Sequence, residues 1–324
     1  MPTKRAVLLA SCLAAALAAC SPQIRLDLLG EDKLQEVVLR PNAARDKVLM
    51  IDIDGTISSA LETGFLSREE SVVARVSERL DRAAADPRVK AVILRLDTPG
   101  GEVTASDIIY NEILRFKERT GLPVIGLMMS VAASGGYYIA AACDLIVAHP
   151  STLTGSIGVI SIFPSVEALM SKVGVKVNII KSGPAKDSGS PFRDMTEEEK
   201  KMFQGIIDEY YEGFLAVVAK GRKGKIAAAD LRTIADGRVY TAPQALKLGL
   251  IDGVGYFDDA FGKARDLASI ERAKLVSYTY FPKTKTNIYA EQLGRFSPLE
   301  AKVVESMVGA LKTGFYYLWL PRTP

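Results

Sequence analysis

The sequence predicts an α/β fold with mostly parallel strands and flanking helices, and two observations support this prediction. Apolar or alternating runs, several of them bounded by Gly or Pro, recur along the chain as buried strands would. Segments with the spacing of amphipathic helices lie between these runs. Strands that alternate with helices are typical of a parallel sheet covered by helices. With 324 residues, 48% of them hydrophobic, the chain can bury one large core or two modest ones.

The strand and helix predictions follow the chain in order. Strands are expected at residues 34–39, 47–55, 89–97, 123–130, 144–149, 156–163 and 175–183. Helices are expected at residues 67–85, 105–119 and 134–142, then as two or three short helices within 225–268, and finally at 297–313. A longer helix is expected to begin at Thr196, because Glu199 follows three residues later as in a capping box, and to continue to about Lys220.

The first residues resemble an export signal. Lys4 and Arg5 precede an apolar or small run from Ala6 to Ala19, which is shorter than the roughly 20 residues that span a membrane. The run ends in Leu-Ala-Ala-Cys at Cys20, which resembles the lipobox of bacterial lipoproteins, where this cysteine is diacylated and becomes the first residue after cleavage. An uncleaved anchor and a chance cysteine are the alternatives. We expect a lipid-anchored protein of the bacterial cell envelope that faces the periplasm or the exterior.

The charge content argues against one class of partner, and the cysteine content argues against stabilisation by disulfides. Lys and Arg number 41 against 38 Asp and Glu, without a basic block, so nucleic acid is not expected as a partner. Cys12 would leave with the signal and Cys20 would carry lipid, so Cys143 would remain alone. No disulfide is then possible within one mature chain, and stability must come from the core.

One serine lies in an unusual run of small residues. In SVAASGGYYIAAACD, residues 130–144, Ser134 stands directly before Gly135 and Gly136. The glycines remove side-chain bulk where a helix could begin, so backbone N–H groups could approach a group bound at Ser134 Oγ. This pattern predicts a nucleophile. The alternative is a tight strand-to-helix junction in which the serine caps the helix.

A serine nucleophile requires a general base, and the sequence offers two kinds. The chain has a single histidine, His149, which a Ser-His-Asp triad would have to use. Lys181 and Lys186 lie in a loop of small residues, KSGPAKDSGSPFRD, and lysine serves as the base in Ser-Lys enzymes. A lysine must be enclosed in an apolar pocket to act near neutral pH, since its ordinary pKa is about 10.4. Surface charge is the alternative for each lysine.

Two blocks of sequence identify a family. MSVAASGGYYIAAACDLIVAHPSTLTGSIGV and KSGPAKDSGSPFRDMTEEE resemble the signal peptide peptidase A family of membrane-associated serine peptidases, in its short bacterial form, over roughly residues 47–270. The resemblance implies a Clp protease/crotonase-like fold with a Ser-Lys dyad. Ser134 is then the nucleophile and Lys186 the general base. Lys181 falls outside the matched position, and the family has no histidine at the position of His149.

The same resemblance assigns the supporting residues. The family's oxyanion donor is a backbone N–H in a strand-end glycine pair, which matches Gly101 in DTPGG, and Gly135 is expected as a second donor. A simple turn is the alternative for DTPGG. Ser156 matches the serine that holds the lysine amine, with Thr154 and Ser151 as alternatives. No cofactor and no metal is expected.

The resemblance also implies an assembly. In short-form relatives the protomers form a bowl and the lysine comes from a neighbouring subunit, so we expect a homo-oligomer. Relatives usually carry a spanning helix, whereas this chain has the lipobox-like signal. The GFYYLWLP tail could serve assembly, lie on the membrane surface or be buried as part of a terminal helix. The expected organisation is a signal at 1–19, a lipidated spacer at 20–46, a peptidase domain at 47–270 and a C-terminal extension at 271–324.

These expectations combine into a membrane-associated serine endopeptidase. Its substrates would be apolar peptides, among them signal-peptide remnants left near the membrane. Two other functions remain on the same fold. One is a non-catalytic scaffold that binds apolar peptides, which would not need Ser134, Lys186 and Gly101 together. The other is crotonase-type acyl-thioester chemistry, which would need carboxylates and a nucleotide pocket that the sequence gives no reason to place.

Overall fold

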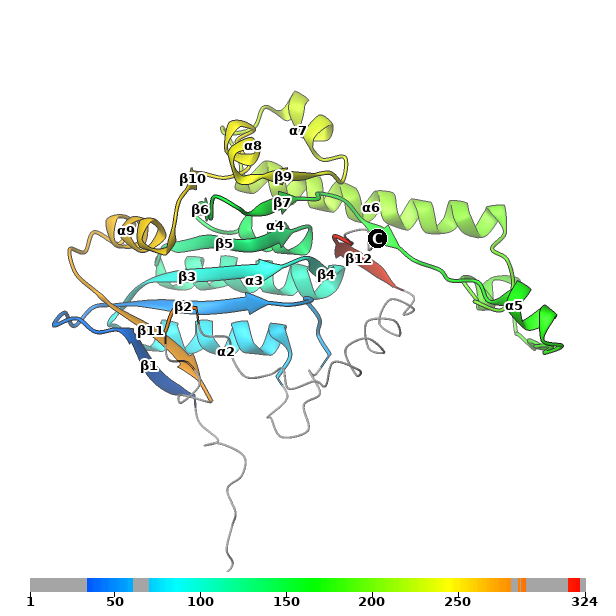
Figure 1. Cartoon of the computed structure of the whole chain (residues 1–324), viewed down its shortest axis with the longest axis horizontal. Coiled ribbons are helices and arrows are strands. Elements are labelled where there is room, and N and C mark those ends of the chain that lie inside the picture. The colour runs from blue at the N-terminus through cyan, green and yellow to red at the C-terminus, as the bar shows by residue number, and fades with distance from the viewer. Residues whose placement is uncertain (1–33, 61–69, 281–284, 286, 290–313, 321–324) are drawn as a thin grey trace, which may run out of the picture.

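The computed structural model describes residues 34–60, 70–280, 285, 287–289 and 314–320. Figure 1 shows a central sheet with helices on both faces and a green segment around α5 (Glu167–Lys172) that extends away from this body. The signal, Cys20 and the helix expected at 297–313 lie outside the described residues. Among the described helices, none is both long enough and apolar enough to cross a membrane.

The central sheet is mostly parallel, as predicted. Its order is β1-β11-β2-β3-β5-β6-β10, with β7 paired to β5 and β9 paired to β7. Only the β1–β11 and β7–β9 pairs are antiparallel among the described strands of this sheet. The strands are β1 (Gln35–Arg40), β2 (Lys47–Asp54), β3 (Val89–Thr98), β5 (Val124–Ala133), β6 (Leu145–Ala148), β7 (Leu153–Gly155), β9 (Val239–Thr241), β10 (Gly253–Val254) and β11 (Lys274–Thr279).

Apolar side chains on both faces explain why the strands of this sheet read as nearly continuous hydrophobic runs. In β2, Leu49 and Ile51 join the core that contains α2 and α3, whereas Val48 and Met50 join a second core with α9. The helices are α2 (Val72–Ala85), α3 (Val103–Thr120), α4 (Gly135–Ala140), α6 (Glu197–Gly221), α7 (Ala228–Ile234), α8 (Ala242–Lys247) and α9 (Phe257–Leu267).

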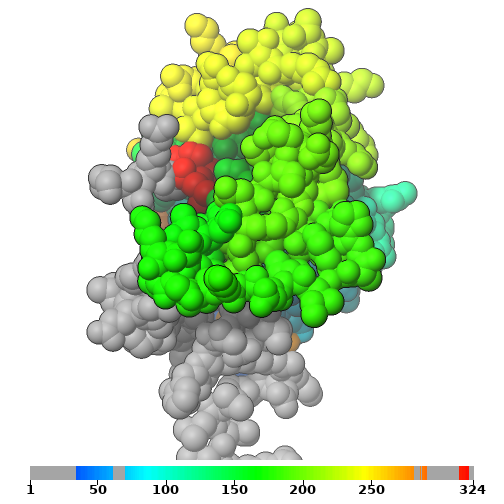
Figure 2. Space-filling view, turned by 90° about the vertical axis from the view of Figure 1, so that its right-hand side faces the viewer, coloured from blue at the N-terminus to red at the C-terminus, as the bar shows by residue number. Residues whose placement is uncertain are grey.

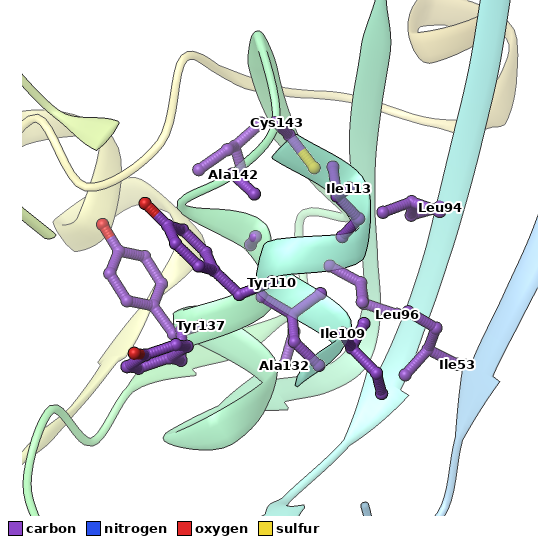
Figure 3. Packing of buried hydrophobic residues seen from close by; sticks show 14 of the residues in the cluster. Ile53, Leu94, Leu96, Ile109, Tyr110, Ile113, Ala132, Tyr137, Ala142 and Cys143 are labelled. Carbon is purple, nitrogen blue, oxygen red and sulfur yellow. The ribbon is translucent and has the colours of Figure 1, made fainter. Parts of the chain in front are cut away.

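The larger core lies between the sheet and α3. Figure 3 shows Leu94 and Leu96 of β3 beside Ile109 and Ile113 of α3, and all four side chains are fully buried. These contacts hold α3 across the sheet. They also fix β4, which leads directly into this helix.

A second, small sheet joins three segments that are distant in sequence. It consists of β4 (Gly100–Glu102), β12 (Phe315–Leu318) and β8 (Ile160–Ser161), with β12 in the middle and antiparallel to both neighbours. Part of the C-terminal tail therefore forms a strand. The sequence analysis had considered a terminal helix or a segment on the membrane surface for this tail.

The segment from 164 to 196, which we call the arm, is held together by its own contacts. The N–H of Val166 donates to the carbonyl of Pro191 at 2.7 Å, and the N–H of Asp194 donates to the Glu167 carboxylate at 2.9 Å. The arm contains α5 and the short 3₁₀ helix η1 (Pro184–Asp187). Its exposed large apolar side chains are Leu169, Val173, Val175, Val177, Ile179, Ile180 and Phe192.

Two strand predictions in this region were wrong. Residues 175–183 form no strand, because they lie in the arm, where none of the described strands pairs with them. The strand expected at 156–163 is reduced to the two residues of β8, and β7 forms just before it. The main sheet also extends beyond residues 47–270, since β1 and β11 are part of it.

Candidate active site

Ser134 lies at the junction of β5 and α4 in a strained backbone conformation. Its φ is +53° and its ψ −113°, although left-handed φ values are uncommon for residues with a side chain. Its N–H donates to the carbonyl of Gly155 at 2.8 Å. The Ser134 side chain makes no capping bond to α4, so the simple capping role does not apply. A serine on a strained strand-to-helix turn is typical of nucleophiles.

The glycines beside Ser134 are required by close backbone approach. A carbon added to Gly135 would stand 2.5 Å from Ser106 Oγ and 3.2 Å from the nitrogen of Gly101. A carbon added to Gly101 would stand 2.0 Å from the carbonyl oxygen of Ile57. Neither position tolerates a side chain, and the two backbone segments that carry the expected oxyanion donors lie next to each other.

The N–H of Gly101 points away from Ile57. The N–H of Ile57 donates to the carbonyl of Gly100 at 2.9 Å, and the N–H of Glu102 donates to the carbonyl of Ile57 at 2.8 Å. Successive backbone groups of a strand point to opposite sides, so the N–H and carbonyl of Gly101 face the other side of β4, where β12 lies.

Ser156 lies beside Ser134 at the end of the adjacent strand. β7 pairs with β5 in a register that sets Gly155 opposite Ala133, so the two serines follow aligned residues. Ser156 also has a left-handed φ, +49°, and is buried. Of the two alternatives, Thr154 donates its hydroxyl to the carbonyl of Ala132 at 2.7 Å, and Ser151 bonds the ring of the histidine two residues before it.

Lys186 is not part of this group within a single chain. It lies in η1 on the arm, where it is exposed, and no hydrogen bond joins it to Ser134 among the described residues. Lys181 is engaged elsewhere in the arm, where its amine donates to the carbonyl of Pro184 at 2.9 Å and to Asp187 at 2.6 Å. The structure thus brings four of the five expected site residues together and leaves the lysine apart.

An arginine fixes the arm next to Lys186. The Arg193 guanidinium donates to Asp187 at 2.9 Å and to Glu199 at 2.9 Å, which ties η1 to the start of α6. The hydrogen bond from Arg193 lowers the pKa of Glu199 to about 2, and the pKa of Asp187 also lies well below its usual range. Glu199 closes the predicted capping box with Thr196, so one carboxylate serves both the helix and the arm.

The structure gives His149 and Cys143 no part in this site. The His149 ring bonds Ser151 at 2.8 Å and packs edge-on against Tyr256, with the ring centroids 5.0 Å apart. Ala148, the residue before His149, pairs with Met128 of β5, and Met128 lies six residues before Ser134 in the chain. Burial raises the pKa of the Cys143 thiol to about 12, so the thiol is not a nucleophile near neutral pH.

Our sequence analysis did not predict that the C-terminal strand reaches this site. Tyr317 of β12 lies opposite Gly101 and is buried against Tyr138 and Phe214. Figure 2 shows β12, in red, recessed between the green arm region and the yellow segment of α7 and α8. The aromatic run GFYYLWLP was the available signal, since a buried, apolar tail must pack against something. Within the described residues, no group of His, Cys, Asp and Glu could hold a metal ion.

Comparisons with known proteins show which proteins this chain resembles. The model of peptidase family S49 matches residues 117–271, which include Ser134, Ser156 and Lys186. The chain is 34% identical to "Putative signal peptide peptidase SppA" of Enterococcus faecium, over 77% of this chain and 72% of the relative. It is 36% identical to "Putative protease slr0021" of Synechocystis sp., over 72% of this chain and 78% of the relative.

Two further matches are more partial. The chain is 34% identical to "Protease 4" of Salmonella typhi over 80% of its own length, but this covers 42% of that longer protein. A solved structure of a mutant 1510-N membrane-bound stomatin-specific protease is 22% identical, with a TM-score of 0.43, and the match covers 68% of this chain and 85% of that one.

Proposed function

Because this chain belongs to peptidase family S49, the signal peptide peptidase A family of serine proteases, we propose that Ser134 is its nucleophile and Lys186 its general base. The observation that carries this proposal is the strained backbone of Ser134, which lies beside the closely packed backbones of Gly135 and Gly101. A scaffold that only binds peptides has no need of such a strained serine.

The proposed reaction is acyl transfer through an ester intermediate. Ser134 Oγ attacks the carbonyl carbon of the substrate, and the N–H groups of Gly101 and Gly135 stabilise the oxyanion. The neutral Lys186 amine accepts the serine proton and then delivers it to the leaving amine. Water, activated by the same amine, hydrolyses the ester and restores the serine.

We propose that Lys186 comes from a neighbouring copy of the chain. The arm that carries it extends from the body and exposes a set of large apolar side chains, among which Ile180 is fully exposed. Exposed apolar patches of this kind are typical of association surfaces. Docking of this arm on a second copy would bury these side chains and enclose Lys186, which favours its neutral form. Ser156 would then hold the amine with its hydroxyl.

The substrates that we propose are apolar peptides, including the signal-peptide remnants that remain near a membrane. A diacylated Cys20 would anchor the enzyme there, since two acyl chains are sufficient for stable attachment. The enzyme would face the periplasm or the exterior of a bacterial cell. It would need neither a metal nor a cofactor, because the dyad supplies the proton transfers.

Covalent labelling tests the proposal directly. A fluorophosphonate probe should modify Ser134 in the purified, assembled protein, as read by peptide mass spectrometry. Ser134→Ala and Lys186→Ala should each lower peptide hydrolysis by roughly 10³-fold or more while the thermal unfolding midpoint stays unchanged. His149→Ala is the matched control and should retain activity. Loss of activity in His149→Ala with normal activity in Lys186→Ala would refute the Ser-Lys mechanism.

A further inference from the structure

A buried threonine hydroxyl joins two backbone segments next to Gly101, the proposed oxyanion donor. Thr98 is the last residue of β3, and it is fully buried. Its hydroxyl donates to the carbonyl of Gly55, the residue after β2, and accepts the N–H of Gly100 at 3.1 Å. A hydroxyl can donate one hydrogen bond and accept another, so both bonds form together. Thr98 therefore bridges the end of β2 to the start of β4.

The segment that receives this hydroxyl also bonds β4 two residues later. The N–H of Ile57 donates to the carbonyl of Gly100 at 2.9 Å, and the N–H of Glu102 donates to the carbonyl of Ile57 at 2.8 Å. Gly100 thus has its N–H bonded to Thr98 and its carbonyl bonded to Ile57. The carbonyl and the N–H of a trans peptide point in opposite directions. The N–H of Gly101 is therefore turned to the other side of β4.

The peptide between Gly100 and Gly101 needs these bonds to keep its orientation. Gly100 has a φ of +100°, and glycine adopts positive and negative φ with similar ease. Rotation of this peptide would place the carbonyl of Gly100 where the N–H of Gly101 now lies. A carbonyl oxygen there would repel a developing oxyanion, whereas an N–H stabilises it. The bonds made by Thr98 and Ile57 thus decide which group faces the reaction.

The methyl group of Thr98 makes a separate contact. A carbon added to Gly136, two residues after Ser134, would stand 2.7 Å from Thr98 Cγ2, so the methyl packs against the first turn of α4. Gly100 lies close to the same turn, because a carbon added to it would stand 2.7 Å from the nitrogen of Gly135. The two branches of the threonine therefore contact β4 and the turn that carries the nucleophile.

On the basis of the proposed function, we propose that Thr98 is a positioning residue whose hydroxyl keeps the N–H of Gly101 in the orientation that stabilises the oxyanion. The substrate oxygen gains its negative charge only in the transition state, so the hydroxyl raises kcat and leaves KM unchanged. The methyl group contributes to the stability of the fold and not to the reaction.

Separate removal of the two branches tests this role in the full, assembled protein. Thr98→Val keeps the branched shape without the hydroxyl and should lower kcat about 10- to 100-fold at unchanged KM, since a misplacement of about 1 Å can cost that much. Thr98→Ser keeps the hydroxyl and should retain kcat within a few-fold, with a lower thermal unfolding midpoint. Thr98→Ala has neither branch and should lose kcat as Thr98→Val does, so it answers the same question if Thr98→Val does not fold.

Thr152→Val is the matched control. Thr152 is also buried, with 1% of the residue exposed, and its hydroxyl donates to backbone carbonyls of β5 from the loop between β6 and β7. The control loses the same kind of hydrogen bond as Thr98→Val. It should lose stability in the same way and keep the wild-type kcat.

A peptide aldehyde measures stabilisation of the oxyanion directly. Ser134 Oγ forms a bond to the aldehyde carbon, the electron pair of the carbonyl bond moves to its oxygen, and the serine proton passes to Lys186. The adduct resembles the transition state, so its inhibition constant should rise in Thr98→Val about as much as kcat falls. The corresponding peptide alcohol forms no adduct and should bind the wild type and all variants equally.

The outcomes separate this inference from the function on which it depends. If Thr98→Val matches Thr152→Val in kcat and in aldehyde inhibition, or if Thr98→Ser loses as much kcat as Thr98→Val, the inference is wrong and the peptidase mechanism stands. If the wild type neither hydrolyses peptides nor reacts with fluorophosphonate at Ser134, the proposed function fails and the inference fails with it.

Discussion

At the scale of single residues, backbone geometry at Ser134 determines the site. Ser134 has a left-handed φ, and the glycine directly after it packs closely against a second glycine on β4, so the backbone segments with the proposed oxyanion donors lie side by side. Such preorganised donors stabilise a developing oxyanion without reorganising during the reaction. Because the backbones approach so closely at these glycines, even the methyl group of an alanine should disturb the site.

Gly101→Ala should therefore disable the enzyme more than an ordinary Gly→Ala change. The added carbon would stand 2.0 Å from the backbone oxygen of Ile57, so β4 must shift and its N–H must leave its place. We expect kcat to fall about 10²-fold or more, as for loss of one oxyanion donor. Gly213→Ala on α6, where the added carbon meets nothing within 4 Å, is the matched control. Activity of Gly101→Ala near that of the control would exclude Gly101 as a donor.

The sequence could single out Ser134 as a candidate because its signal is local. Ser134 and its glycines adjoin one another in the chain, and a motif of that kind needs no tertiary information. The position of Lys186 relative to Ser134 could not be predicted from one chain, since it depends on where the arm docks. The place of Tyr317 was missed because it comes 216 positions after Gly101 in the chain and is brought opposite that glycine by strand pairing.

At the scale of elements, the arm and α6 are joined by the Arg193 ion pairs. The strand expected at 175–183 shows how such a segment misleads: Val175, Val177 and Ile179 alternate with polar residues as in a half-buried strand, yet they are exposed in the single chain. An alternation of apolar and polar residues indicates that one face of a segment is covered. It does not show whether the same chain or another one covers that face.

Acid should break the ion pair between Arg193 and Glu199 that holds the arm to α6. The pKa of Glu199 is about 2 in the folded chain and ordinarily about 4.5, so the stability it contributes is fully present above pH 4.5 and is lost as the pH falls toward 2. Hydrogen exchange should show η1 opening over this range. Arg193→Met should exchange quickly already at pH 7, with little further pH dependence.

Arg115→Met, which breaks an exposed pair with Glu112, serves as the control for that experiment. It should exchange in η1 as the wild type does at every pH, because surface pairs contribute little. Equal protection of η1 in Arg193→Met and the wild type at pH 7 would show that Arg193 does not hold the arm.

At the scale of the whole molecule, one buried ion cluster ties the C-terminal region to the sheet. Asp52 of β2 bonds Arg95 of β3 at 2.7 Å and pairs with the fully buried Lys285, while Arg95 also donates to the carbonyl of Ile288 at 2.9 Å. Burial lowers the pKa of Lys285, but its pairing with Asp52 opposes this.

Lys285→Met should lower the free energy of unfolding by about 3 kcal/mol, because it leaves a buried carboxylate with one cation fewer. Urea unfolding followed by circular dichroism measures the change. Arg88→Ala removes an exposed partner of Asp86 and should change the free energy of unfolding by less than about 1 kcal/mol. A loss in Lys285→Met no larger than in Arg88→Ala would mean that the cluster contributes little.

Assembly should depend on the apolar side chains of the arm. Ile180→Glu places a charge on a fully exposed residue of this surface, so it should shift the protein toward monomers in light scattering after size exclusion. It should lower peptidase activity in the same proportion, since the lysine then has no neighbour to reach. Leu246→Glu, at an exposed site on α8, should change neither. A monomeric wild type with full activity would contradict the shared site.

The most direct measurement of the central claim is complementation between two inactive proteins. Ser134→Ala retains the lysine and Lys186→Ala retains the serine, so co-assembly in equal amounts should restore about a quarter of wild-type activity if each site draws on two neighbouring copies. A mixture that assembles but stays inactive would show that the two groups do not meet across a subunit interface.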